Sequence, residues 1–111
     1  MWLMTPIGFF SIVQKPDDRT RNTLTIRTRV KGDLEALRQG YLSDMGEILE
    51  HQGTDYRYRA VAPKASVASA LSQLTLNLDY DNFKDEVRRV QGDERARTYG
   101  EVWCALYRLQ D

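Results

Sequence analysis

The chain has 111 residues, 41% of them hydrophobic and 29% charged, and its 16 basic and 16 acidic residues give a formal net charge of zero. This length and balance predict a single folded domain spanning residues 1–111, with a core that needs neither disulfides nor a metal. A net charge of zero excludes attachment to nucleic acid or to anionic membranes by bulk charge alone.

The first residues, MWLMTPIGFFSIV, are apolar but lack the features of a signal peptide. They have no basic leading segment and no small-residue cleavage site, and Pro6 and Gly8 interrupt them. No run of the sequence approaches the ~20 apolar residues that a membrane span needs. We therefore expect a cytoplasmic protein that does not bind a membrane.

Two segments in the first third of the chain are predicted to be β-strands. Residues 8–14 form a nearly continuous apolar run, which is typical of a strand at the centre of a sheet. Residues 15–22 are rich in Pro, Asp and charge, and they predict a loop. Residues 23–31 alternate between apolar and polar side chains, which predicts a strand with one buried face.

The middle of the chain predicts a helix, an ambiguous segment and a third strand. The helix is expected between Asp33, a plausible N-cap, and Gly40. Residues 43–52 fit either a helix or a short strand, and we favour the helix. Residues 54–62 alternate again and predict a strand whose tyrosines and alanines point inward.

The remainder of the chain is predicted to be helical. An amphipathic helix follows Pro63, and a loop at residues 79–82 separates it from two further helices that meet at Gly92. The aromatic residues of this last third are expected to lie mostly in the core; they are Tyr80, Phe83, Tyr99, Trp103 and Tyr107.

These elements predict an α+β fold with a helical C-terminal third. If the strands at 8–14 and 23–31 form a hairpin and the strand at 54–62 takes the other edge of 8–14, the sheet is three-stranded and antiparallel, in order 2-1-3. This is a ferredoxin-like arrangement without its last strand. One face of so narrow a sheet accepts about two helices. The surplus helices must therefore cover the other face, stack as a second layer or form a dimer interface, and we favour the homodimer.

Four arginines at strand spacing form the first candidate site. Arg27 and Arg29 alternate with apolar residues in one predicted strand, as Arg57 and Arg59 do in another, so all four are expected on one sheet face. Order 2-1-3 places the two pairs at opposite edges, with Phe9 or its neighbour between them. Arginines around an aromatic ring are typical of single-stranded nucleic-acid platforms. They are also ordinary on a solvated strand face, and we favour this simpler interpretation.

Catalytic and metal chemistry finds little support in the sequence. His51, the only histidine, has no positioned partner, and Cys104, the only cysteine, lies in an apolar helix and is expected to be a buried thiol. Asp79 and Asp81 are better explained as helix caps, because the spacing of an EF-hand loop fails. We expect no metal and no cofactor, and we favour a protein that is not an enzyme.

Four segments of the chain resemble a family of small bacterial proteins of unknown function. These segments are MWLMTPIGFFSIVQK, GTDYRYR, LDYDNFK and YGEVWCALY. They are similar to Trp-Leu-x-Thr-Pro-x-Gly-Phe-Phe-Ser, Gly-Thr-Asp-Tyr-x-x-Arg, Tyr-x-Asn-Phe-Lys and Tyr-x-x-Val-Trp in that family. The resemblance covers nearly the whole chain and implies no activity, ligand or catalytic residue.

The favoured function is therefore protein interaction, as a homodimer or an accessory subunit. Residues 1–31 carry a net charge of +4, residues 32–55 carry −5 and the rest +1, and such segregation suits self-association. The first alternative is single-stranded nucleic-acid binding through the four arginines. The second is a small-ligand or enzymatic pocket, for which the candidate residues are Asp55, Tyr56, Arg57 and Tyr80.

Overall fold

The computed structural model describes residues 1–51 and 53–110, and it divides into two compact units, Met1–Leu78 and Asp79–Asp111. The expectation of a single domain stays a prediction.

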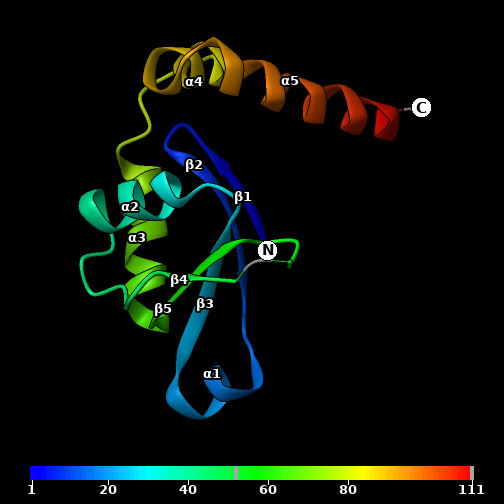
Figure 1. Ribbon diagram of the computed structural model, residues 1–111. Helices are drawn as coiled ribbons and strands as arrows, with labels where there is room; N and C mark the ends of the chain where they lie inside the picture. The colour runs from blue at the N-terminus through cyan, green and yellow to red at the C-terminus, as the bar shows by residue number, and fades with distance from the viewer. Residues whose placement is uncertain (52, 111) are drawn as a thin grey trace. The chain divides into compact units, whose positions relative to one another are not determined.

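The first unit is built on an open antiparallel sheet of five strands, in the order β1-β2-β3-β5-β4 (Figure 1). The strands are β1 (Trp2–Thr5), β2 (Gly8–Val13), β3 (Thr23–Thr28), β4 (Leu49–Glu50) and β5 (Tyr58–Pro63). The predicted α+β class is therefore confirmed. The predicted three-stranded sheet is wrong, and its ferredoxin-like order is not confirmed.

The central strand is β3 rather than β2, and β1 is the reason. Thr5 and Gly8 face each other at a tight turn between β1 and β2, where the Thr5 hydroxyl oxygen accepts the Gly8 N–H at 3.1 Å. This hairpin occupies one edge of β2, and β3 occupies the other. The later strand β5 therefore pairs with the free edge of β3, and order 2-1-3 cannot form.

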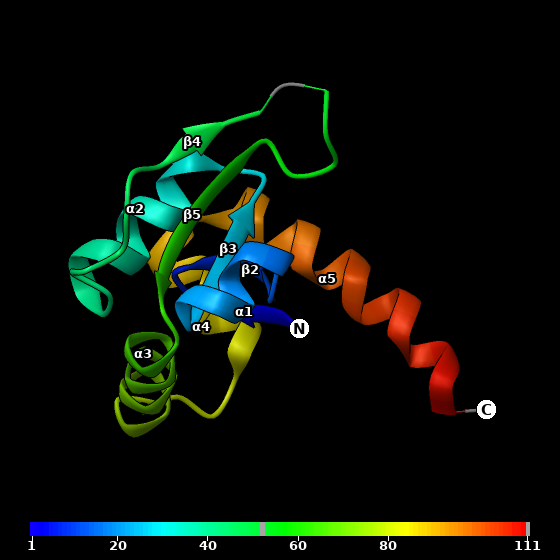
Figure 2. The ribbon, with the colours of Figure 1, turned by 90° about the horizontal axis from the view of Figure 1, so that it is seen from below.

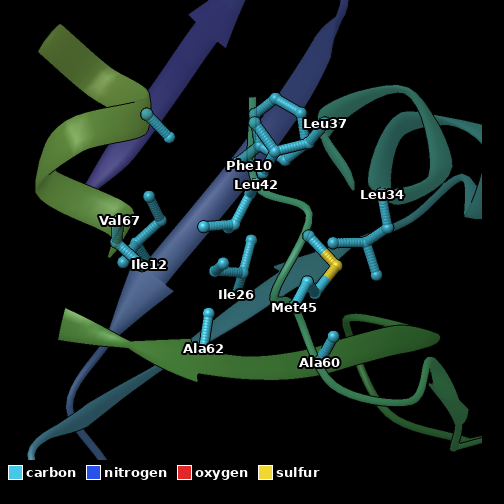
Figure 3. Close-up of a cluster of buried hydrophobic side chains, with 11 residues drawn as sticks. Phe10, Ile12, Ile26, Leu34, Leu37, Leu42, Met45, Ala60, Ala62 and Val67 are labelled. Carbon is cyan, nitrogen blue, oxygen red and sulfur yellow. The ribbon is translucent and has the colours of Figure 1, made fainter. Parts of the chain in front are cut away.

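Helices α2 (Lys31–Gly40) and α3 (Lys64–Leu76) cover one face of this sheet (Figures 1 and 2). Their buried side chains meet those of β2, β3 and β5 in one cluster, drawn in Figure 3. The largest fully buried apolar residues of this cluster are Phe10, Ile26, Leu34 and Leu42. The inward positions predicted from alternation are confirmed for Ile26 in β3 and for Ala60 and Ala62 in β5, because all three belong to this core.

The opposite face of the sheet, here called the open face, meets a short helix at one end. Helix α1 (Pro16–Arg21) forms within the segment expected to be a loop. Proline in its first turn and Asn22 in the left-handed conformation after its end favour one and a half turns of helix. Its Asp18 carboxylate accepts hydrogen bonds from the hydroxyls of Thr23 (2.6 Å) and Thr25 (2.7 Å), which fixes α1 against β3.

Residues 43–52 were expected to be helical, and this prediction is wrong over its described part. The segment runs beside β5, where the Gly46 N–H donates to the Val61 carbonyl at 2.8 Å and β4 then pairs with the start of β5. The free edge of β5 thus satisfies backbone groups that a helix would have satisfied internally. Gln52 lies outside the described residues.

The second unit contains α4 (Phe83–Gln91) and α5 (Asp93–Tyr107), followed by a 3-10 turn at Arg108–Gln110. Gly92, at φ 96°, separates the two helices as predicted. The cap of α4 is Asn82, whose side-chain oxygen accepts the Asp85 N–H at 2.9 Å, rather than Asp79 or Asp81. The rings of Phe83 and Tyr99 stack at 5.7 Å between the two helices.

Candidate functional site

One residue from every strand lies in a single row across the open face. The directly opposed partners are Trp2, Ser11, Arg27, Arg59 and Leu49. Side chains of opposed residues share a face, so this row lies on the side away from α2 and α3. Arg27 and Arg59 are immediate neighbours. The expectation that the arginine pairs lie at opposite edges is therefore wrong, because β5 pairs with β3.

The loop that precedes β5 folds over these arginines. The predicted strand at 54–62 begins only at Tyr58, and residues 53–57 lie on the side of the sheet away from α2 and α3 (Figure 2). Tyr56 is only 3% exposed. The guanidinium carbons of Arg27 and Arg29 lie 4.6 and 4.9 Å from the centroid of its ring, within the range of cation–π contacts. Tyr56 is thus buried among arginines rather than in the main core.

Three arginines converge on this loop, and we call Arg27, Arg29 and Arg59 the arginine cluster. Arg29 donates from Nε to the Asp55 carbonyl at 3.0 Å, and Arg59 donates to the Tyr56 carbonyl at 3.2 Å. Arg27 donates to the Ser11 hydroxyl at 2.7 Å. All three acceptors are neutral, so the loop holds the cluster without neutralising it.

The arginine cluster is electrostatically unbalanced. In the described part of the chain no ion pair joins it to a carboxylate. The Nε–H groups of Arg27 and Arg59 are also buried, and no acceptor for them lies within residues 1–51 and 53–110. Like charges directly opposed across strands destabilise a sheet, and a buried donor without a partner costs about 1–3 kcal/mol.

Arg57, the fourth predicted arginine, is not part of the cluster. Its guanidinium donates to the Glu50 carboxylate from Nε at 3.0 Å and from a terminal nitrogen at 2.8 Å. This hydrogen-bonded carboxylate raises the pKa of Arg57 above its ordinary value. Arg57 is therefore a neutralised surface residue on the same loop.

Two aromatic side chains extend the open face beyond the cluster. Phe9 is half-buried and meets the edge of Trp2, with ring centroids 5.5 Å apart at 86°. Trp2 is 68% exposed. Phe9 therefore lies on the arginine face as predicted, but beside β1 rather than between the arginine pairs. Sequence reasoning missed Trp2 and Ser11; pairing of the alternating WLMT segment with β2 would have identified both.

A groove of about 380 Å³ runs along the open face beside Arg59. Lys15, Arg21 and Glu47 are among the charged residues that line it. Burial alone would raise the pKa of the Asp18 carboxyl in this groove, but hydrogen bonds from Thr23, the Lys15 backbone and Thr25 hold it below its ordinary value. The Asp18 carboxylate is fully bonded, which suits a structural role rather than proton transfer.

The predicted small-ligand residues have separate environments. Asp55 is exposed, and only its backbone carbonyl is used by the cluster. Tyr80 belongs to the second unit, where its ring lies 6.3 Å from Phe83 and burial raises its pKa. A pocket that includes Asp55, Tyr56 and Tyr80 stays a prediction.

The residues considered for nucleophilic or metal chemistry are exposed. Cys104 was expected to be buried, and this is wrong: it lies on the exposed side of α5. His51 is also exposed. Among residues 1–51 and 53–110, no group of three His, Cys, Asp or Glu side chains is placed to hold a metal ion, and none of the helices is long and apolar enough to cross a membrane.

The end of α5 carries the second candidate surface. Helix α4 has nine residues and α5 has fifteen; the first residue of α4, Phe83, already packs on Tyr99. Lys84, the second residue of α4, places its Nζ 5.5 Å from the centroid of the Trp103 ring. Helix α4 does not reach the residues of α5 that follow Trp103. Four large apolar side chains from Trp103 onward are between 56% and 82% exposed, and we call them the α5 stripe: Trp103, Leu106, Tyr107 and Leu109.

The predicted core role of the last aromatic residues is therefore only partly confirmed. Tyr99 is buried and Tyr80 and Phe83 are half-buried, whereas Trp103 and Tyr107 are exposed. The physical reason is the short length of α4, which leaves the second half of α5 without a neighbouring helix in its own unit.

No protein-family model, no curated protein and no solved structure matches this chain. The resemblance to a small bacterial family stays a prediction.

Proposed function

We propose that the chain is a non-enzymatic protein-interaction module that associates with a second copy of itself through the α5 stripe. The observation that carries this proposal is the exposure of four large apolar side chains, three at the end of α5 and Leu109 in the 3-10 turn that follows it. Large apolar side chains exposed near one another mark an interaction surface more often than an ordinary solvent-exposed surface.

The spacing of the stripe suits helix-to-helix packing. Trp103, Leu106 and Tyr107 follow one another at i, i+3 and i+4, so they share one side of α5. The rings of Trp103 and Tyr107 already contact each other, with centroids 5.3 Å apart. A second helix laid along this side would bury the stripe as α4 buries Tyr99 in the first half of α5.

The charge pattern favours a second copy of this chain over a charged partner. Residues 102–107 read VWCALY, an uncharged run bounded by Glu101 and Arg108. Two identical uncharged runs can pack against each other without opposing like charges. The net charge of zero also means that two copies do not repel each other at long range.

The proposal is tested by the concentration dependence of the mass in solution. Sedimentation equilibrium of the wild type should show a monomer–dimer equilibrium. Leu106→Glu should weaken the dimer at least tenfold, because dimerisation would then bury an unpaired charge in an apolar contact, at a cost above about 1.4 kcal/mol.

The matched control is Leu76→Glu. Leu76 is 72% exposed, also at the end of a helix, but it belongs to α3 of the first unit. This variant should dimerise as the wild type does. A wild type that stays monomeric at the highest attainable concentration, or equal weakening by both variants, would contradict self-association through the stripe.

A further inference from the structure

We propose that the open face of the first unit binds a nucleotide unit, with its phosphate on the arginine cluster and its base on Trp2. The ligand chemistry is a phosphate next to a planar ring, which a free nucleotide and a single-stranded nucleic acid both present. This site is separate from the α5 stripe and does not depend on self-association.

The first argument is the unused hydrogen-bonding capacity of the cluster. Three guanidinium groups carry about fifteen N–H donors. In the part of the chain that the structure describes, the cluster uses three of them, on the Ser11 hydroxyl and on two backbone carbonyls. Planar guanidinium groups suit the oxygen atoms of phosphate in particular.

The second argument is that the arrangement is unfavourable for folding alone. Arg27 and Arg59 are directly opposed on neighbouring strands, and each has a buried Nε–H for which the described residues supply no acceptor. Local features that lower stability without a compensating partner concentrate at functional sites. A negatively charged phosphate bound by the two guanidinium groups would offset the repulsion between the two side chains.

The third argument is the position of Trp2. It stands in the same cross-strand row as Arg27, two strand steps away, or ~10 Å. The sugar of a nucleotide and the long arginine side chain together bridge such a distance. The rings of Phe9 and Trp2 pack nearly at right angles to each other. Trp2 is 68% exposed, so a base can stack on its indole.

The form of the site favours a single strand over a duplex. Stacking on Trp2 needs an unpaired base, because the bases of a duplex are already stacked. The chain also lacks the net positive charge by which proteins hold the backbone of a duplex.

Fluorescence of Trp2 tests the proposal directly. The chain has two tryptophans, so Trp103→Phe leaves Trp2 as the single reporter. Titration with a mixed-sequence single-stranded oligonucleotide at low salt should quench this fluorescence to saturation, and added salt should weaken the binding. A parallel titration with a nucleoside monophosphate distinguishes the two candidate ligands. If it quenches the fluorescence as strongly as the oligonucleotide does, the ligand is a free nucleotide; if only the oligonucleotide quenches, the ligand is a single-stranded nucleic acid.

Variants separate the cluster from general charge. Arg29→Met and the double change Arg27→Met with Arg59→Met should each reduce the affinity, by at least threefold and tenfold respectively. Arg57→Met is the matched control, because Arg57 lies on the same loop but is paired with Glu50; it should change the affinity by less than twofold. Since Arg29 is exposed, its variant keeps the test valid if the double variant does not fold.

The role of Trp2 is tested with a labelled ligand and fluorescence anisotropy. Trp2→Ala should weaken binding about tenfold and Trp2→Phe much less, since phenylalanine keeps an aromatic ring on which a base can stack. Three results would overturn the proposal: no saturable quenching by either ligand, equal loss in Arg57→Met, or inorganic phosphate competing as well as the nucleotide.

Discussion

The ring of Tyr56 and the guanidinium of Arg27 lie in contact, with the guanidinium carbon 4.6 Å from the ring centroid. Tyr56 precedes β5, whereas Arg27 is part of β3, so this contact holds the loop against the open face of the sheet. The buried ring also shields one side of the cluster from water, which strengthens the interactions of its charges.

Replacing Tyr56 by alanine should destabilise the first unit. The change removes the ring of a residue that is 3% exposed and deprives Arg27 and Arg29 of their aromatic contact, and such truncations cost about 3–5 kcal/mol. Tyr56→Phe keeps the ring and should cost less than about 1 kcal/mol. Urea unfolding of the two variants measures both values; equal stability of Tyr56→Ala and the wild type would show that the loop does not pack as described.

Replacing Gly8 by alanine should also destabilise the fold, because β2 approaches α2 very closely there. A Cβ at Gly8 would lie 2.6 Å from the Cβ and Cγ of Asp33, whose carboxylate accepts the Phe9 N–H at 3.0 Å. We expect a loss of about 1–3 kcal/mol from overpacking.

The control for this change is Gly40→Ala. Gly40 ends α2, and a Cβ there meets nothing within 4 Å. Because alanine favours the helix over glycine by up to about 1 kcal/mol, this variant should be neutral or slightly more stable. Thermal unfolding compares the two, and a loss in Gly40→Ala as large as that in Gly8→Ala would argue against the close approach to Asp33.

Asp18 should make stability depend on pH in the acid range. Burial opposes its ionisation, but the Thr23, Lys15 backbone and Thr25 hydrogen bonds favour it and leave its pKa below the ordinary 3.8. Because the pKa of Asp18 is lower in the folded protein than in the unfolded chain, the ionised carboxylate stabilises the fold at pH values above 3.8. This stabilisation is lost as the pH falls through the lowered pKa. Asp18→Asn should therefore cost about 1–3 kcal/mol near neutral pH, with the difference from the wild type shrinking as the pH falls below 3.8.

Asp17→Asn is the matched control for this pH dependence. Asp17 lies in the same helical turn but is exposed, so its replacement should change stability by less than about 1 kcal/mol through the helix dipole. Urea unfolding at several pH values gives both differences. A pH-independent difference for Asp18→Asn would contradict the ionised, hydrogen-bonded state of this carboxylate.

The sequence predicted the elements whose periodicity is strong. The alternation of residues 23–31 and 54–62 correctly assigned Ile26, Ala60 and Ala62 to the core, and Gly92 correctly separated the last two helices. Alternation also placed Arg27 and Arg59 on one face, since period two is a local property of a strand. It left open whether Phe9 or Phe10 shares that face, and Phe10 lies in the core.

Strand order, by contrast, was decided only by the tertiary structure. Whether β5 joins β2 or β3 depends on which edge is free, and β1 had already taken the edge of β2. Local periodicity does not show which edge of a strand is free for pairing. The sequence therefore predicted Arg27 and Arg59 at opposite edges of the sheet, whereas they are directly opposed on β3 and β5. The same holds for Tyr56 and Trp103: their apolar character was evident, but their burial depends on a bend before β5 and on the length of α4. Periodicity thus determined which residues share a face, while edge occupancy and helix length determined what covers that face.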